Sequence, residues 1–433
     1  MKYLSHLLVL IFLSSCSSMA FWDSEQEEVE VKEPRSFVDI ITFWDNGDEE
    51  VDLSEPKILS DISNQEELVL NWEVALPSDR SATDFIPNFS GEGENQLGSF
   101  FPAFIGNTIF IANGDGAVGS FDQDSGNENW VVNVSPLASG ISAGFGILVV
   151  AGSQGELICL SQDDGSIIWS IDVGSEILAP AALDAKLVLV KTSSGELNAY
   201  NINTGVREWS YRSQLPTLTL RGSSPPIIEE GIVYAAFDNG RLGAFQVDTG
   251  FLIWDGAISY VEGTSELDNM IDADAAPVLE GGLLFIANYQ GQIAAFDPAQ
   301  RRIVWAEEAS SFYSPIISKG VMAVLETDST FKTFSTKTFM PSWTNDDYYL
   351  RELSNADTYK GSLVVGDFEG YIHFINTLNG TTTSRMKLTR SPIKSIIARA
   401  NNIYIVDEQF NFCLLYTSPS PRDRTRSRMP SSA

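Results

Sequence analysis

Hydrophobic and polar positions in this chain alternate in short runs, and the runs recur in a fixed frame. The clearest copy is the segment GELNAYNINTGVREW, from Gly195 to Trp209. A strand-like run closes at Tyr200, a turn signal ends at Gly205, and the returning run contains the Trp. This order predicts a β-hairpin whose turn glycine adopts a positive φ without the steric cost of a Cβ.

The spacing of the hairpin is kept along most of the chain. Counted from the first Gly, an aromatic residue or Leu follows at +5, a Gly at +10 and a Trp at +14. Three more copies keep the full frame: Gly116, Phe121, Gly126, Trp130; Gly155, Leu160, Gly165, Trp169; and Gly240, Phe245, Gly250, Trp254. Three weaker copies replace one or two members: Gly291, Phe296, Arg301, Trp305; Ser329, Phe334, Phe339, Trp343; and Gly370, Ile375, Gly380, Ser384.

These repeats predict an all-β fold, an eight-bladed β-propeller over residues 66–416. Successive Trp positions lie between 38 residues apart (Trp305 to Trp343) and 51 residues apart (Trp254 to Trp305), as expected for blades of four short strands. Trp72 stands in a strand-like run with no hairpin before it, and the segment before residue 416 has three strand-like runs and no Trp strand. We therefore expect the N-terminal strand to pair with the C-terminal blade and close the ring.

The N-terminal region predicts a lipid-anchored export segment. Residues 1–15 combine Lys2 with an apolar run too short to span a bilayer, which is typical of a signal peptide. Small residues precede Cys16, as in the lipobox of bacterial lipoproteins, where the Cys is acylated; Ser17 rather than Asp follows it, which in those proteins implies the outer membrane. Residues 16–65 are acidic and poor in apolar side chains, which predicts a flexible tether.

The formal net charge of −31 argues against nucleic acid as a ligand. The basic residues 417–433 share neither this acidity nor the repeat, and they resemble translated adapter sequence, so we expect a non-native tail that could include Cys413. Cys159 lies in an apolar run and is expected in the core.

No arrangement in the sequence predicts catalysis, a metal site or a bound cofactor. The stretch Gly114 to Gly119 matches G-x-G-x-x-G, but a strand rather than a helix is expected after it, so we interpret these glycines as blade turns. His373 is the single His beyond the predicted signal peptide, and we expect it to be packed or exposed rather than catalytic. Four Asp residues fall in predicted turns, which they favour for local reasons: Asp122, Asp124, Asp163 and Asp164.

The repeats resemble the pyrroloquinoline-quinone type of propeller blade, and two segments narrow the resemblance. PTLTLRGSSPP (216–226) and NMIDADAAPVL (269–279), together with GDFEGYIHFIN (366–376) and the lipobox, resemble the BamB family, lipoprotein subunits of the bacterial β-barrel assembly machinery. The resemblance implies a non-enzymatic scaffold on the periplasmic side of the outer membrane. Its expected partners are the POTRA domains of BamA, other subunits of the machinery and unfolded outer-membrane proteins.

By motif match, the resemblance assigns the contact with BamA to five residues: Leu218, Leu220, Arg221, Asp272 and Asp274. Alignment of Pro226 with Pro277 places Arg221 and Asp272 at the same position of adjacent blades, so we expect them to lie close together on one rim. An inter-blade ion pair that only braces the ring is the alternative for these charges. For the whole protein, the alternatives are a quinoprotein-like dehydrogenase that has lost recognisable ligands and a generic ligand-binding propeller.

Overall fold

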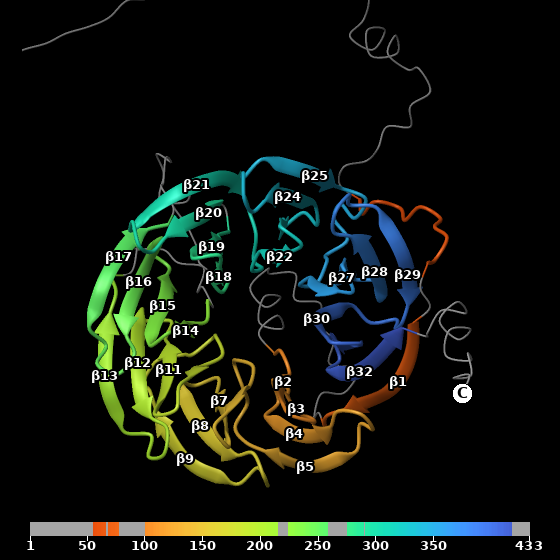
Figure 1. Ribbon diagram of the computed structural model, residues 1–433. Coiled ribbons are helices and arrows are strands. Elements are labelled where there is room, and N and C mark those ends of the chain that lie inside the picture. The colour runs from red at the N-terminus through yellow and green to blue at the C-terminus, as the bar shows by residue number, and fades with distance from the viewer. Residues whose placement is uncertain are drawn as a thin grey trace, which may run out of the picture. The chain divides into compact units, whose positions relative to one another are not determined.

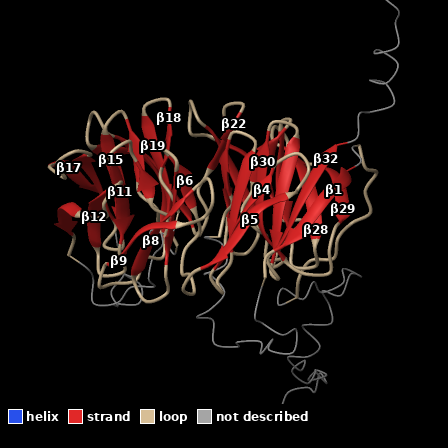
Figure 2. Cartoon of the chain, turned by 90° about the horizontal axis from the view of Figure 1, so that it is seen from below, coloured by secondary structure: helices blue, strands red, loops and turns tan. Residues whose placement is uncertain are grey.

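Eight antiparallel sheets of four strands each form a ring, which confirms the predicted eight-bladed β-propeller (Figure 1). The computed structural model describes residues 55–65, 68–77, 100–214, 224–258, 275–289 and 291–417, all within the compact unit Ser54–Ala433. The described residues form strands, turns and bends (Figure 2), and none of them belongs to a helix long and apolar enough to cross a membrane.

Strand position within a blade decides burial. The innermost strands are β2 (Ala103–Ile105), β6 (Ser142–Gly144), β10 (Ala182–Leu183), β14 (Ile227–Glu229), β18 (Val278–Glu280), β22 (Ile316–Ser318), β26 (Asp357–Tyr359) and β30 (Ile393–Arg399). The second strands are β3 (Thr108–Ala112), β7 (Ile147–Ala151), β11 (Leu187–Lys191), β15 (Ile232–Phe237), β19 (Leu283–Ala287), β23 (Val321–Leu325), β27 (Ser362–Gly366) and β31 (Asn402–Asp407). Second strands are apolar at nearly every position because a neighbouring blade covers each of their faces.

The third strands of blades one to six carry the aromatic residue or Leu of the repeat, and that of blade seven carries Ile375. The third strands are β4 (Ala117–Asp122), β8 (Glu156–Ser161), β12 (Glu196–Asn201), β16 (Arg241–Gln246), β20 (Gly291–Asp297), β24 (Phe331–Ser335), β28 (Tyr371–Asn376) and β32 (Asn411–Thr417). The outer strands are β5 (Glu128–Asn133), β9 (Ile167–Asp172), β13 (Arg207–Arg212), β17 (Leu252–Ala257), β21 (Arg302–Ala309), β25 (Pro341–Asn345), β29 (Thr382–Lys387) and β1 (Leu68–Ala75). Blades one to seven are β2–β5 through β26–β29, and blade eight is β30–β32 with β1.

The N-terminal strand closes the ring, as the sequence predicts. β1 pairs antiparallel with β32, with Glu73 opposite Cys413 and Ala75 opposite Asn411. Cys413 is therefore a core residue of blade eight, 6 % exposed, and the expectation that it could belong to the tail is wrong. Cys159 is also buried, as predicted, and burial raises the pKa of each thiol to about 12. Both cysteines are free.

Each of five repeat Trp residues stabilises the contact with the following blade. Its indole N–H donates to a carbonyl there: Trp72 to Gln123 (3.2 Å), Trp130 to Gln162 (3.0 Å), Trp169 to Ile202 (2.8 Å), Trp209 to Val247 (2.9 Å) and Trp343 to Thr377 (3.0 Å). Its ring lies over the turn glycine of that same blade. The Gly and the Trp of one hairpin thus take part in two different interfaces, and five of the eight blade-to-blade contacts are made in this way.

Candidate partner-binding face

One face of the ring carries the long connections between blades. Because successive strands run in opposite directions, the turn after each second strand and the connection after each outer strand lie on the same face. We call this the loop face. Residues 213–226 connect β13 to β14, and residues 258–277 connect β17 to β18. The five residues assigned to the partner contact, Leu218, Leu220, Arg221, Asp272 and Asp274, fall in these two connections and lie outside the described residues, as does Cys16.

The described ends of the two connections are joined directly. Ser224 donates its hydroxyl proton to the carbonyl oxygen of Ala275 over 2.9 Å, and both residues are buried. Ser224 lies two residues before Pro226 and Ala275 two before Pro277, so the bond joins equivalent positions of blades four and five. The alignment that pairs Arg221 with Asp272 uses this same register.

The beginnings of both connections are also hydrogen-bonded to the next blade. The side-chain amide of Asn239 donates to the hydroxyl of Ser213 (3.0 Å) and to the carbonyl of Gln214 (2.9 Å). The side-chain amide of Gln292 donates to the carbonyl of Ile258 over 3.3 Å. Each connection therefore leaves and rejoins the ring at points held by blade-to-blade hydrogen bonds.

A buried ion pair lies between blades three and four. The ammonium of Lys191 is 3.3 Å from Asp238 and 3.1 Å from the carbonyl oxygen of Ala236, and both charged side chains are 3 % exposed. Loss of one member alone would leave an unpaired charge in the interior, which commonly destabilises a fold by about 3–5 kcal/mol. An inter-blade pair was only the alternative interpretation of Arg221 and Asp272, and the pair of Lys191 with Asp238 was not predicted. Its signal in the sequence is a Lys at the end of the apolar run LVLVK.

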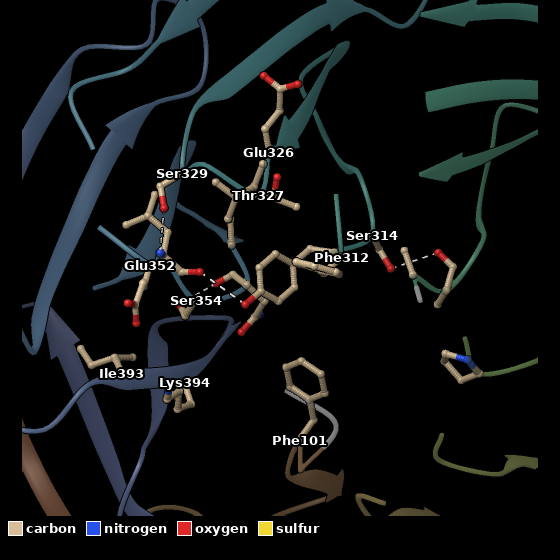
Figure 3. A pocket seen from close by; sticks show the side chains of 18 of the residues that line it. Phe101, Phe312, Ser314, Glu326, Thr327, Ser329, Glu352, Ser354, Ile393 and Lys394 are labelled. Atoms are coloured by element: carbon tan, nitrogen blue, oxygen red, sulfur yellow. Dashed lines mark hydrogen bonds between the residues drawn. The ribbon is translucent and has the colours of Figure 1, made fainter. Parts of the chain in front are cut away.

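A cavity of about 480 Å³ lies on the loop face at the inner ends of the blades (Figure 3). Its lining combines the rings of Phe101, Phe312 and Tyr313 with Glu352 and Lys394. The hydroxyl of Tyr313 donates to the carbonyl oxygen of Leu353 over 3.3 Å, and burial raises the pKa of Tyr313 to about 12. Pro225 and Ala275, at the ends of the two long connections, also line this cavity.

The glycine motif and the turn aspartates singled out in the sequence lie in turns and strands of the blades. Residues 114–119 form the turn after β3 and the start of β4, so a strand follows the glycine motif as predicted. Asp122 accepts from the hydroxyl of Ser125 (2.6 Å) and Asp164 from that of Ser166 (2.7 Å), and these bonds lower the pKa of each carboxyl. Within the described ranges, no group of three or more His, Cys, Asp or Glu is placed to hold a metal ion.

His373 is packed, as one of the two expectations has it, and its side chain is fully buried. It lies among charged groups rather than in an apolar core, with Asp367 and Arg385 within hydrogen-bonding distance. Sequence reasoning did not foresee this cluster because its members are spread over blade seven and the chain before it.

Sequence comparison matches this chain to proteins named outer membrane protein assembly factor BamB. The family model described as "Outer membrane protein assembly factor BamB" matches residues 114–345. A protein of that name from Shewanella oneidensis is 33 % identical over 309 residues, covering 68 % of this chain and 78 % of the relative. The one from Escherichia coli is 28 % identical and covers 68 % of this chain and 79 % of the relative.

Solved structures agree on the fold. The crystal structure of BamB from Moraxella catarrhalis superposes with a TM-score of 0.71 at 24 % identity, over 81 % of this chain and all (100 %) of that one. A quinohemoprotein alcohol dehydrogenase from Comamonas testosteroni superposes with a TM-score of 0.62 at 11 % identity, over 86 % of this chain and 78 % of that one. Likeness at these identities concerns the propeller architecture alone.

Proposed function

Because the chain belongs to the BamB family of outer membrane protein assembly factors, we propose that it is a non-enzymatic scaffold that binds the periplasmic POTRA domains of BamA. In this role it aids the insertion of unfolded outer-membrane proteins as one subunit of the assembly machinery. The contact is made by Leu218, Leu220, Arg221, Asp272 and Asp274, in the two long connections of the loop face.

The hydrogen bond between Ser224 and Ala275 is the observation that most supports this site. It joins the ends of the two connections that carry the family motifs, at equivalent positions of adjacent blades. Two leucines beside a charged pair suit a protein surface better than a solvated loop, because clustered apolar side chains favour contact with a partner. An extended edge strand of the partner is the mode of docking that such a rim accommodates.

The test is the double substitution Leu218→Ala with Arg221→Ala. Anchor residues of an interface commonly contribute about 2 kcal/mol or more each, so each change should weaken affinity for a POTRA fragment about thirtyfold. The thermal midpoint should stay unchanged, because both residues lie between β13 and β14 in the chain, outside the described blade strands. Both quantities are measured on the same preparation, by calorimetric titration and by thermal unfolding.

Arg212→Ala is the matched control for this experiment. Arg212 ends β13 just before the first connection, its side chain is 72 % exposed, and its contact with Glu196 is long at 3.8 Å. We expect it to change neither affinity nor stability. If the double variant instead loses thermal stability and keeps its affinity, Leu218 and Arg221 brace the ring and the proposed interface is wrong.

We further propose that residues 1–15 are removed as a signal peptide, that Cys16 is lipidated, and that the chain between Cys16 and residue 55 tethers the ring to the periplasmic face of the outer membrane. Residues 55–65, predicted as part of this tether, are instead hydrogen-bonded to the ring. Several acyl chains, at about 0.8 kcal/mol per buried CH₂, anchor a protein in effect permanently. Cys16→Ser should therefore move the protein from the membrane pellet to the soluble fraction or leave it unprocessed. Continued fractionation with the outer membrane would contradict the lipid anchor.

A further inference from the structure

Residues 55–65 run along the outside of blade seven before the chain enters β1 (orange beside β29 in Figure 1). We call this segment the strap. Its backbone is held at both ends: the amide of Lys57 donates to the carbonyl of Tyr349 (3.0 Å), and the amide of Gln65 donates to the carbonyl of Thr383 (3.1 Å). The amide of Arg385 in β29 also donates to the side-chain oxygen of Asn64 (2.8 Å).

Two arginines hold carbonyl oxygens of the strap: Arg351, in the connection before blade seven, and Arg385, in β29. Arg351 donates from Nη1 to the carbonyl of Lys57 over 3.1 Å, and Arg385 donates from Nη1 to the carbonyl of Ser60 over 2.8 Å. These are charge-assisted bonds, stronger than bonds between neutral groups. The strap is thus fastened to the ring at two points by the same type of side chain.

Behind the strap, the two arginines are connected through buried Asp367 and His373. Arg351 donates from Nε (3.0 Å) and Nη2 (2.7 Å) to Oδ2 of Asp367, whose carboxylate is fully buried, and it also pairs with Glu369. Nε2 of His373 lies 3.0 Å from the same Oδ2. Nε of Arg385 lies 3.0 Å from Nδ1 of His373. A continuous row of polar contacts therefore joins the strap carbonyl of Lys57 to that of Ser60.

The geometry determines where the proton of His373 lies. A guanidinium has only N–H donors, so Nδ1 facing Arg385 must be an unprotonated acceptor, and the proton sits on Nε2, donated to Asp367. The other titratable or charged groups that face the imidazole of His373 are Tyr348 (ring centroids 4.7 Å apart), Tyr371 (6.2 Å) and Arg351. Burial lowers the pKa of His373, Asp367 raises it, and the two arginines lower it, with a net lowering.

We propose that Arg351, Asp367, His373 and Arg385 form a proton-sensitive latch that fastens the strap to blade seven. Protonation of His373 can occur only at Nδ1, where the new N–H would point at the Nε–H of Arg385 and place two positive charges together. Arg385 must then move, and its bond to the carbonyl of Ser60 is lost. Arg351 keeps Asp367, so Lys57 stays held while the chain between Ser60 and β1 is released.

Amide hydrogen exchange resolved by residue tests the latch in the full chain. After correction for intrinsic rates, the amides of Gln65 and Arg385 should exchange about tenfold or more faster at about pH 5 than at about pH 7.5, while the amide of Lys57 changes little. The chain has two histidines, His6 and His373, so ¹⁵N-histidine spectra resolve the protonation of His373 directly. At neutral pH its Nε2 should carry the proton.

Two substitutions distinguish release of the strap by the latch from a general loss of stability at low pH. His373→Asn cannot take up a proton and should keep the strap protected at both pH values. Arg385→Ala removes the contact with Ser60 and should give fast exchange of Gln65 already at about pH 7.5.

The proposal is overturned if His373 titrates while strap exchange stays constant. It is also overturned if His373 stays neutral until the ring unfolds. Unchanged exchange in Arg385→Ala at neutral pH refutes it even where His373→Asn fails to fold.

Discussion

At the scale of single residues, the contact between Trp and Gly explains why a turn Gly and a Trp recur together in the repeat. The sequence shows this pattern but not its cause. A positive φ accounts for a turn Gly, but it does not account for a Trp four residues later. In the structure a Cβ on Gly250 would lie 2.4 Å from Cε3 of Trp209 in the preceding blade, and one on Gly205 would lie 2.9 Å from Cε3 of Trp169. The glycines are therefore required by conformation and by the close approach of the indole.

Gly250→Ala is expected to destabilise the protein by about 3 kcal/mol, because backbone strain adds to overlap with the indole of Trp209. Gly231→Ala is the matched control: its φ is +77°, comparable with +67° at Gly250, but a Cβ there meets no atom within 4 Å. The control should cost about 1 kcal/mol from strain alone. Urea unfolding of the two variants measures both costs, and equal values would show that the indole contact contributes nothing.

The surroundings of a side chain could be predicted from sequence where its immediate neighbours in the chain determine them. Cys159 in an apolar run and Asp122 in a turn have the surroundings that their local sequence indicates. Prediction failed where residues distant in sequence converge. The network around His373 joins Arg351, Asp367 and Arg385, and no spacing marks that set before the blade is built.

At the scale of elements, the number and order of the blades could be predicted because each hairpin is a local unit whose turn and Trp recur in sequence. Closure by β1 followed from matching a surplus strand at one end to a missing strand at the other. The position of the strap could not be predicted from the sequence in this way. Residues 55–65 lie within the segment predicted as a flexible tether. Their polar composition gives no sign of their contacts with Arg351 and Arg385.

Trp72→Ala tests the closing strand. The indole is half-buried, donates to Gln123 of blade one and lies 5.6 Å from the ring of Phe412, so its loss should cost about 3 kcal/mol. Asn71→Ala on the same strand is the control: its amide donates to the carbonyl of Asp124 over 3.0 Å on the exposed side, and its loss should cost about 0.5 kcal/mol. Chemical denaturation compares the two, and a Trp72 cost no larger than that of Asn71 would show that the ring does not depend on this contact.

At the scale of the whole molecule, the ring presents two kinds of surface to its surroundings. The loop face carries the long connections and the cavity, whereas the strap covers part of the outer wall at blade seven. The architecture is shared with an alcohol dehydrogenase, so it cannot by itself specify a function. The family model and the relatives supply the family assignment. The contact residues in the two connections are a proposal that sequence could indicate only through the resemblance.

Acid should lower the stability of the ring through His373. Its pKa is below the ordinary value of 6.5 in the folded protein, chiefly because it is buried. As the pH falls below 6.5, the unfolded chain therefore binds a proton that the folded chain does not, and stability decreases. One proton gives a slope of up to about 1.4 kcal/mol per pH unit, ending at the folded pKa.

Two aspartates modify this acid response. The pKa of Asp357 is raised, chiefly by burial, so its own contribution increases as the pH falls through its folded pKa toward 3.8 and opposes that of His373. For Asp367, burial raises the pKa but the contacts with His373 and Arg351 outweigh it, so the pKa is lowered and stability is lost as the pH falls through 3.8. Urea unfolding between about pH 7 and pH 5, compared between the unmodified protein and His373→Asn, isolates the His373 contribution, because Asp357 contributes to both. The loss of stability on acidification should be smaller in His373→Asn, and an identical slope in that variant would assign the acid sensitivity to other groups.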